Sequence, residues 1–117
     1  MRSSALAVLV TTAAGCGTLP DTRPATTEVI TYEVLAPTCG QVQCHSSSTN
    51  LQGYTLDTVA GVKATLPDLL RTRNNGKTRL VEFIEATGPD RMPPDVPMAS
   101  EDLALLQKWI DAGGLNQ

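Results

Sequence analysis

The strongest hydrophobic pattern of the chain lies near its end, in residues 100–112. Leu103, Leu106 and Ile110 recur at helical spacing, and Trp109 lies beside this stripe. The pattern predicts an amphipathic helix. An N-cap serine, two acidic residues in the first turn and two glycines mark its ends: Ser100, Glu101, Asp102, Gly113 and Gly114.

Residues 77–88, KTRLVEFIEATG, predict a second helix. Thr78 is a suitable N-cap, and Gly88 is a suitable stop. One face would carry the large apolar side chains Leu80, Phe83 and Ile84.

The segment between residues 57 and 70 predicts shorter helical pieces. We expect Asp57 to cap a helix that reaches Ala64, and Pro67 suits the first position of a further turn. In that turn Leu66, Leu69 and Leu70 would form a small apolar face.

Residues 28–36, EVITYEVLA, are compatible with two structures. Their β-branched and aromatic residues favour a strand. The spacing of Ile30 with Val34, and of Tyr32 with Leu35, fits one face of a helix. We predict a helix that Pro37 ends at Ala36.

The stretch PDRMPPDVPM, residues 89–98, holds four prolines and therefore excludes regular structure. Loops of this length in a compact domain usually cover a ligand or serve another function. Together the patterns predict a small all-α domain of three to five helices with long loops.

The first 15 residues have the pattern of a secretory signal. Arg2 supplies a positive start, and the following apolar run is too short to span a bilayer. Small residues then lead to Cys16, which is placed like the lipidated cysteine of bacterial lipoproteins, although Ala13 stands where leucine is usual. We expect lipidation of Cys16. The alternative is an ordinary signal peptide that is cut nearby and leaves Cys16 free.

The next residues suggest how the mature chain is organised. Residues 16–27 are rich in Thr and Pro and predict a flexible tether to the membrane. The domain would then occupy residues 28–117. Export also implies an oxidising compartment, in which Cys39 and Cys44 do not stay free thiols unless something holds them.

Charge narrows the range of partners. Nine basic side chains face twelve acidic ones, a net charge of −3, which argues against nucleic acid. The basic residues Arg71, Arg73, Lys77 and Arg79 would either bind the carboxylates of a ligand or of an acidic partner, or form an ordinary solvated surface.

The segment CGQVQCH carries the most specific chemistry. It contains Cys39, Cys44 and the chain's only histidine, His45. A c-type haem needs two thiols for its two vinyl groups and an imidazole for the iron, and His45 directly after Cys44 suits the iron. The usual signal has two residues between its cysteines, whereas this one has four, and we expect Gly40 to let the additional residues bulge outward.

Two methionines are candidates for the far side of the iron, where a thioether gives a high-potential electron-transfer centre. Met92 precedes Pro93 in a stiff loop, which could hold the sulfur on iron at little entropic cost. Met98 lies two residues before Ser100 and could instead pack on the last helix. We favour Met92, with Met98 as second choice.

Three other readings remain open. Cys39 and Cys44 could form a disulfide in a haem-free lipoprotein domain with a structural or binding role. They could bind zinc with His45, although the fourth ligand would have to be a carboxylate. A haem with an open sixth position could act on peroxide, but the chain has no second histidine for acid–base catalysis.

These segments resemble the small c-type cytochrome domains of bacteria, of the class-I-like planctomycete and myxobacterial type. The matching text is YEVLAPTCGQVQCH, LQGYTLDT, GKTRLVEFI, RMPP and LLQKWIDAGG, in family order across nearly all of the domain. The resemblance implies a cytochrome-c-like fold around one haem, in which the first and last helices cross.

The resemblance also implies site residues. Cys39 and Cys44 would form the thioethers, His45 would be the proximal iron ligand and Met92 the distal one. Trp109, with Ile110, would pack the last helix against the first. The four-residue gap departs from the family pattern. We therefore expect a lipid-anchored, periplasm-facing monohaem cytochrome that carries single electrons between redox proteins and is not an enzyme.

Overall fold

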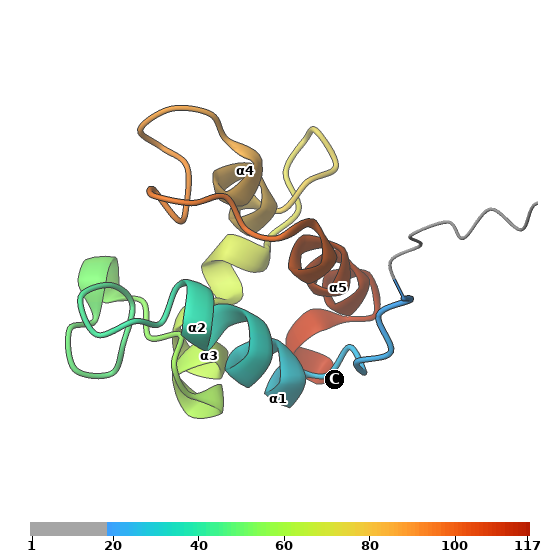
Figure 1. Ribbon diagram of the computed structural model, residues 1–117, viewed down its shortest axis with the longest axis horizontal. Coiled ribbons are helices and arrows are strands. Elements are labelled where there is room, and N and C mark those ends of the chain that lie inside the picture. Colours follow the sequence, from blue (N-terminus) through green and yellow to red (C-terminus); the bar gives the residue numbers. More distant parts are fainter. Residues whose placement is uncertain (1–18) are drawn as a thin grey trace, which may run out of the picture.

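The computed structural model describes residues 19–117, and apart from one isolated β-bridge between Thr72 and Thr78 every regular element there is helical (Figure 1). The all-α prediction is confirmed. The main elements are α1 (Thr27–Val29), η1 (Ile30–Leu35), α2 (Ala36–Thr38), α3 (Val59–Thr65), α4 (Arg79–Glu85) and α5 (Ser100–Asp111). Short 3₁₀ turns are η2 (Leu51–Gly53), η3 (Pro67–Leu70) and η4 (Gly114–Asn116).

The first three elements follow one another without a break and form a single helix, which we call the first helix. The prediction of helix over strand is confirmed, but the expected end at Ala36 is wrong. The first helix runs through Pro37 to Thr38, and its middle part, η1, is a π-helix. There the Ala36 N–H donates to the Thr31 carbonyl, five residues back instead of four.

The caps of α3 and α4 follow from short polar side chains. The Thr78 side chain accepts the Val81 N–H at 3.3 Å, as predicted. The predicted Asp57 cap is wrong, because Thr58 caps α3 by accepting the Gly61 N–H at 3.1 Å. Helix α4 ends at Glu85, before the predicted stop.

The start of α5 differs from its prediction, whereas its end does not. Ala99 is the N-cap residue, and Ser100 is the first helical residue, so the predicted Ser100 cap is wrong. Its hydroxyl instead lies 3.2 Å from a carboxylate oxygen of Glu101. Gly113 follows the helix with φ +116°, a conformation that favours glycine, and the predicted stop is confirmed.

Trp109 is the largest fully buried side chain of the core. Its side chain is fully buried, as is that of Leu106, whereas Leu103 and Ile110 are only half-buried. The predicted stripe is thus displaced toward Trp109. Helix α5 contacts the first helix (Figure 1). The indole Nε1 of Trp109 donates to the Thr27 hydroxyl at 3.3 Å. The indole therefore joins the first and last helices by packing and by a hydrogen bond.

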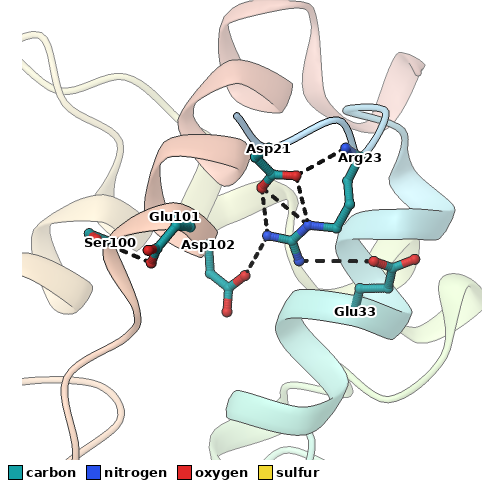
Figure 2. A network of polar contacts seen from close by, with 6 residues as sticks. All are labelled: Asp21, Arg23, Glu33, Ser100, Glu101 and Asp102. Atoms are coloured by element: carbon teal, nitrogen blue, oxygen red, sulfur yellow. Dashed lines mark hydrogen bonds and ion pairs between the residues drawn. The ribbon is translucent and has the colours of Figure 1, made fainter. Parts of the chain in front are cut away.

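Arg23 ties the start of the described chain to the helices, as Figure 2 shows. Its guanidinium contacts Asp21 at 2.7 Å, Asp102 of α5 at 2.8 Å and Glu33 of the first helix at 3.9 Å. The hydrogen bonds from Arg23 lower the pKa of Asp21 to about 2. Part of the expected tether thus lies against the domain. The boundary at residue 28 stays a prediction.

The expected signal peptide and the expected lipidation of Cys16 lie outside the described residues. Within residues 19–117, no helix is long and apolar enough to cross a membrane.

Candidate functional site

The cysteine loop closes directly on the end of the first helix. The His45 N–H donates to the Cys39 carbonyl at 3.0 Å, and the Cys44 N–H donates to the Gln41 carbonyl at 2.8 Å. Between these points Gln41, Val42 and Gln43 are exposed. Three of the four intervening residues therefore bulge outward, while the fourth, Gly40, is buried and the backbone of His45 returns to Cys39.

Gly40 is required for close packing rather than for freedom of φ. A Cβ atom there would lie 3.0 Å from the Ala36 Cα, from the Leu56 carbonyl carbon and from the Asp57 nitrogen. Gly40 has no positive φ. The expected reason for this glycine is thus corrected: its missing side chain lets the helix end approach residues 56 and 57.

The two cysteines are free thiols with different surroundings. Cys39 is 9% exposed and belongs to the core cluster, whereas Cys44 is half-buried. Burial, with a smaller contribution from the charge of Cys44, raises the pKa of the Cys39 thiol to about 11.

His45 is held by one side of its ring. Its Nδ1 lies 2.8 Å from the Leu51 carbonyl oxygen. A carbonyl oxygen only accepts, so Nδ1 carries a proton, and in the neutral imidazole Nε2 is then the nitrogen with the lone pair. A backbone carbonyl on one ring nitrogen is the usual way in which proteins orient a metal-binding histidine.

The segment after the cysteine loop also holds the backbone of the site. The Leu51 N–H donates to the Cys44 carbonyl at 3.2 Å, and the Leu56 N–H donates to the His45 carbonyl at 2.7 Å. Tyr54 places its ring edge-on to His45, with centroids 5.9 Å apart. Sequence reasoning assigned no role to Leu51. The resemblance of LQGYTLDT to a segment of small c-type cytochrome domains was the available signal.

Asp57 pins the outer part of the same loop. Its carboxylate accepts the Ser47 N–H at 2.9 Å and the Ser47 hydroxyl at 2.8 Å. These bonds lower the pKa of Asp57. The residue that was expected to cap α3 therefore holds the loop that carries His45.

The two candidate methionines occupy different environments. Met98 is 9% exposed and is part of the core cluster, whereas Met92 is 39% exposed. The Met92 N–H donates to the Phe83 carbonyl at 2.9 Å, which attaches the methionine to α4. Met98 therefore packs in the core, while Met92 is partly exposed to solvent.

Arg91 braces the turn that follows Met92. Its Nε donates to the Pro93 carbonyl at 3.3 Å, and an Nη donates to the Pro94 carbonyl at 3.1 Å. The Arg91 N–H also donates to the Gly88 carbonyl at 3.2 Å. In Figure 1 this orange loop and the green cysteine loop project on the same side of the helices, away from the C-terminus.

The basic run forms pairs on the surface. The pairs are Arg71 with Asp68 at 3.1 Å, Arg73 with Glu82 at 3.4 Å, Lys77 with Glu85 at 2.6 Å, and Arg79 over the Phe83 ring at 4.9 Å. Each cation thus has a local partner, which favours the reading of a solvated surface.

The residues of the site fit the donor set of a c-type haem. One imidazole oriented through Nδ1, one partly exposed methionine and two free thiols in one loop are the groups that such a cofactor requires of a protein. Within residues 19–117, no three His, Cys, Asp or Glu side chains gather in a way that could hold a metal ion by themselves. Haem iron needs only one imidazole and one thioether from the chain.

The raised pKa of the Cys39 thiol predicts that the reduced, haem-free protein loses stability at high pH. Its pKa is about 11 when folded and 9.0 in the unfolded chain, so unfolding releases a proton between these values. Stability should therefore be full below pH 9 and fall by about 2–3 kcal/mol as the pH rises to 11. Urea unfolding with a reductant measures this loss.

Cys39→Ala is the matched control for that measurement, because it lacks the thiol and keeps every other titrating group. An equal loss of stability in the wild type and in Cys39→Ala would contradict the prediction.

Comparisons with protein-family models, with curated proteins and with solved structures found no match to this chain.

Proposed function

We propose that this chain is a monohaem c-type cytochrome that carries single electrons. Cys39 and Cys44 would each add a thiol across one vinyl group, with a new S–C bond and the thiol proton placed on the neighbouring carbon. His45 would bind the iron on one side and Met92 on the other. When bound, haem c supplies a one-electron iron couple.

The observation that carries the proposal is the bond between His45 Nδ1 and the Leu51 carbonyl. It fixes both the tautomer and the ring orientation, and it leaves Nε2 as the nitrogen that can bind iron. A surface histidine beside a structural disulfide would have no need of this arrangement. The bond also lies in the segment that binds the backbone of Cys44 and His45.

The proposed second iron ligand, Met92, supports a role as an electron carrier. Arg91 braces the loop, so the thioether of Met92 is offered from a rigid turn. A methionine on iron excludes small ligands, and the chain has no second histidine for acid–base chemistry. These features favour electron transfer over catalysis.

The proposed location rests on the N-terminal sequence. A lipid on Cys16 would anchor the domain to a membrane and face it toward the periplasm. Part of residues 16–27 would act as a flexible tether to the membrane, which lets the domain move between redox protein partners.

The direct test is to produce the protein together with a cytochrome c maturation system. A visible spectrum of low-spin haem, and haem staining that survives a denaturing gel, are the expected results. Absence of covalent haem would overturn the proposal. A Cys39–Cys44 disulfide in that product would instead support the haem-free alternative.

We expect Met92→Ala to remove the distal ligand of the haem iron. The weak long-wavelength charge-transfer band of methionine-bound ferric haem should disappear, and carbon monoxide should bind the reduced protein rapidly, since a coordination position opens. The fold should change little, because Met92 is 39% exposed. Absorption spectra with and without carbon monoxide measure both effects.

Met98→Ala is the comparison variant. It should keep the band and lose about 2–5 kcal/mol of stability, because Met98 is buried in the core. Loss of the band in Met98→Ala and its retention in Met92→Ala would reverse the assignment.

A further inference from the structure

The first helix changes its hydrogen-bond register just before the cysteine loop. The Ala36 N–H donates to the carbonyl of Thr31, five residues back, whereas the Cys39 N–H donates to the carbonyl of Leu35, four residues back, at 2.7 Å. At the end of the helix the same Leu35 carbonyl also accepts the Gly40 N–H at 2.8 Å. The change falls on Pro37, which has no N–H. A wide turn of this kind inserts one additional residue into a helix.

Pro37 gives a physical reason for the wide turn. Inside a regular α-helix its ring would clash with the carbonyl of Glu33, four residues back, and that carbonyl would lose its donor. A π turn opens the helix at this point and moves the carbonyl away. Tyr32 and Glu33 are exposed, so water can reach this part of the turn.

The inserted residue decides which side chain continues the buried face. In a regular α-helix each residue advances by about 100°. The buried residues Ile30, Thr31, Val34 and Leu35 would then be continued by Thr38, and Cys39 would lie roughly 100° from the centre of the face.

The structure has the opposite order. Cys39 is 9% exposed and in the core cluster, and Thr38 is only partly buried. One additional residue in the helix accounts for this difference, because it rotates the side chain of Cys39 back to the centre of the buried face. The next residue, Gly40, then packs against the Leu56 carbonyl carbon and the Asp57 nitrogen.

We propose that Pro37 and the π turn before it are the device that positions Cys39 for thioether formation across the four-residue gap. Pro37 is thus a positioning residue: it contacts no reacting atom and acts through the rotation of Cys39. This inference rests on the proposed haem attachment, but the rotation itself concerns only the protein.

The test compares three variants in the reduced, haem-free protein, by mass spectrometry of alkylated peptides. Pro37→Ala restores the N–H and should allow a regular helix, which turns Cys39 outward. We expect the alkylation rate of Cys39 relative to Cys44 to rise about tenfold, since alkylation requires an accessible thiolate. Pro37 is exposed, so the substitution removes no core contact.

Two further variants separate register from a general loss of structure. Pro37→Ala combined with deletion of the exposed Tyr32 removes the additional residue, so the regular helix should place Cys39 inward again and restore its protection. Pro67→Ala, at the exposed start of η3, is the matched proline control and should leave the ratio unchanged.

Haem-loaded protein supplies a second readout. Pro37→Ala should bind haem through Cys44 alone, and the α-band of its alkaline pyridine derivative should move to longer wavelength, as expected when one vinyl group stays unsaturated. The deletion variant should restore the wild-type band.

Unchanged Cys39 protection in Pro37→Ala, or failure of the deletion to restore it, would overturn the inference. If the wild type takes up no haem, the proposed function fails, while the alkylation ratios still decide whether Pro37 sets the register.

Discussion

His45→Ala is expected to abolish the low-spin spectrum of the haem-loaded protein. His45 is the only histidine of the chain, so no other imidazole can take its place. Its bond to the Leu51 carbonyl at 2.8 Å also orients the ring, and both contributions vanish together. Absorption spectra of the oxidised and reduced protein, made with the same maturation system, measure the loss.

Free imidazole added to His45→Ala is the sharpest control. If the defect is the missing ligand, imidazole should restore at least part of the low-spin spectrum, because the site would still exist. Ser48→Ala, an exposed substitution in the same loop, should leave the spectrum unchanged. A wild-type spectrum in His45→Ala without imidazole would exclude this residue as the iron ligand.

Trp109→Ala is expected to have the largest effect on stability. The indole is fully buried and joins the first helix to α5, and removal of such a side chain costs about 3–5 kcal/mol. Domains of this kind have only about 5–15 kcal/mol in total. Urea unfolding followed by far-ultraviolet circular dichroism should show a variant that is unfolded or close to it.

Trp109→Phe separates packing from hydrogen bonding. It keeps an aromatic ring and removes the donor to the Thr27 hydroxyl, so the loss should be smaller than in Trp109→Ala and include about 1 kcal/mol for that bond. A loss below 1 kcal/mol for Trp109→Ala would show that the indole does not hold the two helices together.

The helix caps show where local sequence suffices. Thr78 caps α4 as expected, because no other group competes for the hydrogen bond of its side chain. Asp57 has the same local suitability, but its carboxylate binds Ser47, ten residues earlier, and Thr58 caps α3 instead. A one-dimensional pattern cannot decide between two partners when one of them comes from another loop.

The proline in the first helix shows the opposite problem. The expectation that Pro37 ends the helix follows from its missing N–H and its ring. The structure accommodates both by a π turn, since burial of Val34, Leu35 and Cys39 favours continuation. Packing thus overcomes a local preference, and the compromise is a change of register.

The candidate site divides in the same way. Cys44 and His45 are neighbours in sequence, and so are the residues of the RMPP turn. Both motifs could therefore be recognised from the sequence. The different burial of Met92 and Met98, and the Leu51 carbonyl on His45, depend on contacts between separate segments. No spacing rule contains those contacts.

The sequence by itself determined the all-α class and the approximate places of α4 and α5, and it supplied the candidate haem ligands, because these depend on neighbours within one or two turns. Only the tertiary structure decided that Trp109 is fully buried, that Cys39 faces inward, and that the Leu51 carbonyl lies at Nδ1 of His45. The physical reason is that burial and hydrogen bonding between distant segments choose among local arrangements of similar free energy.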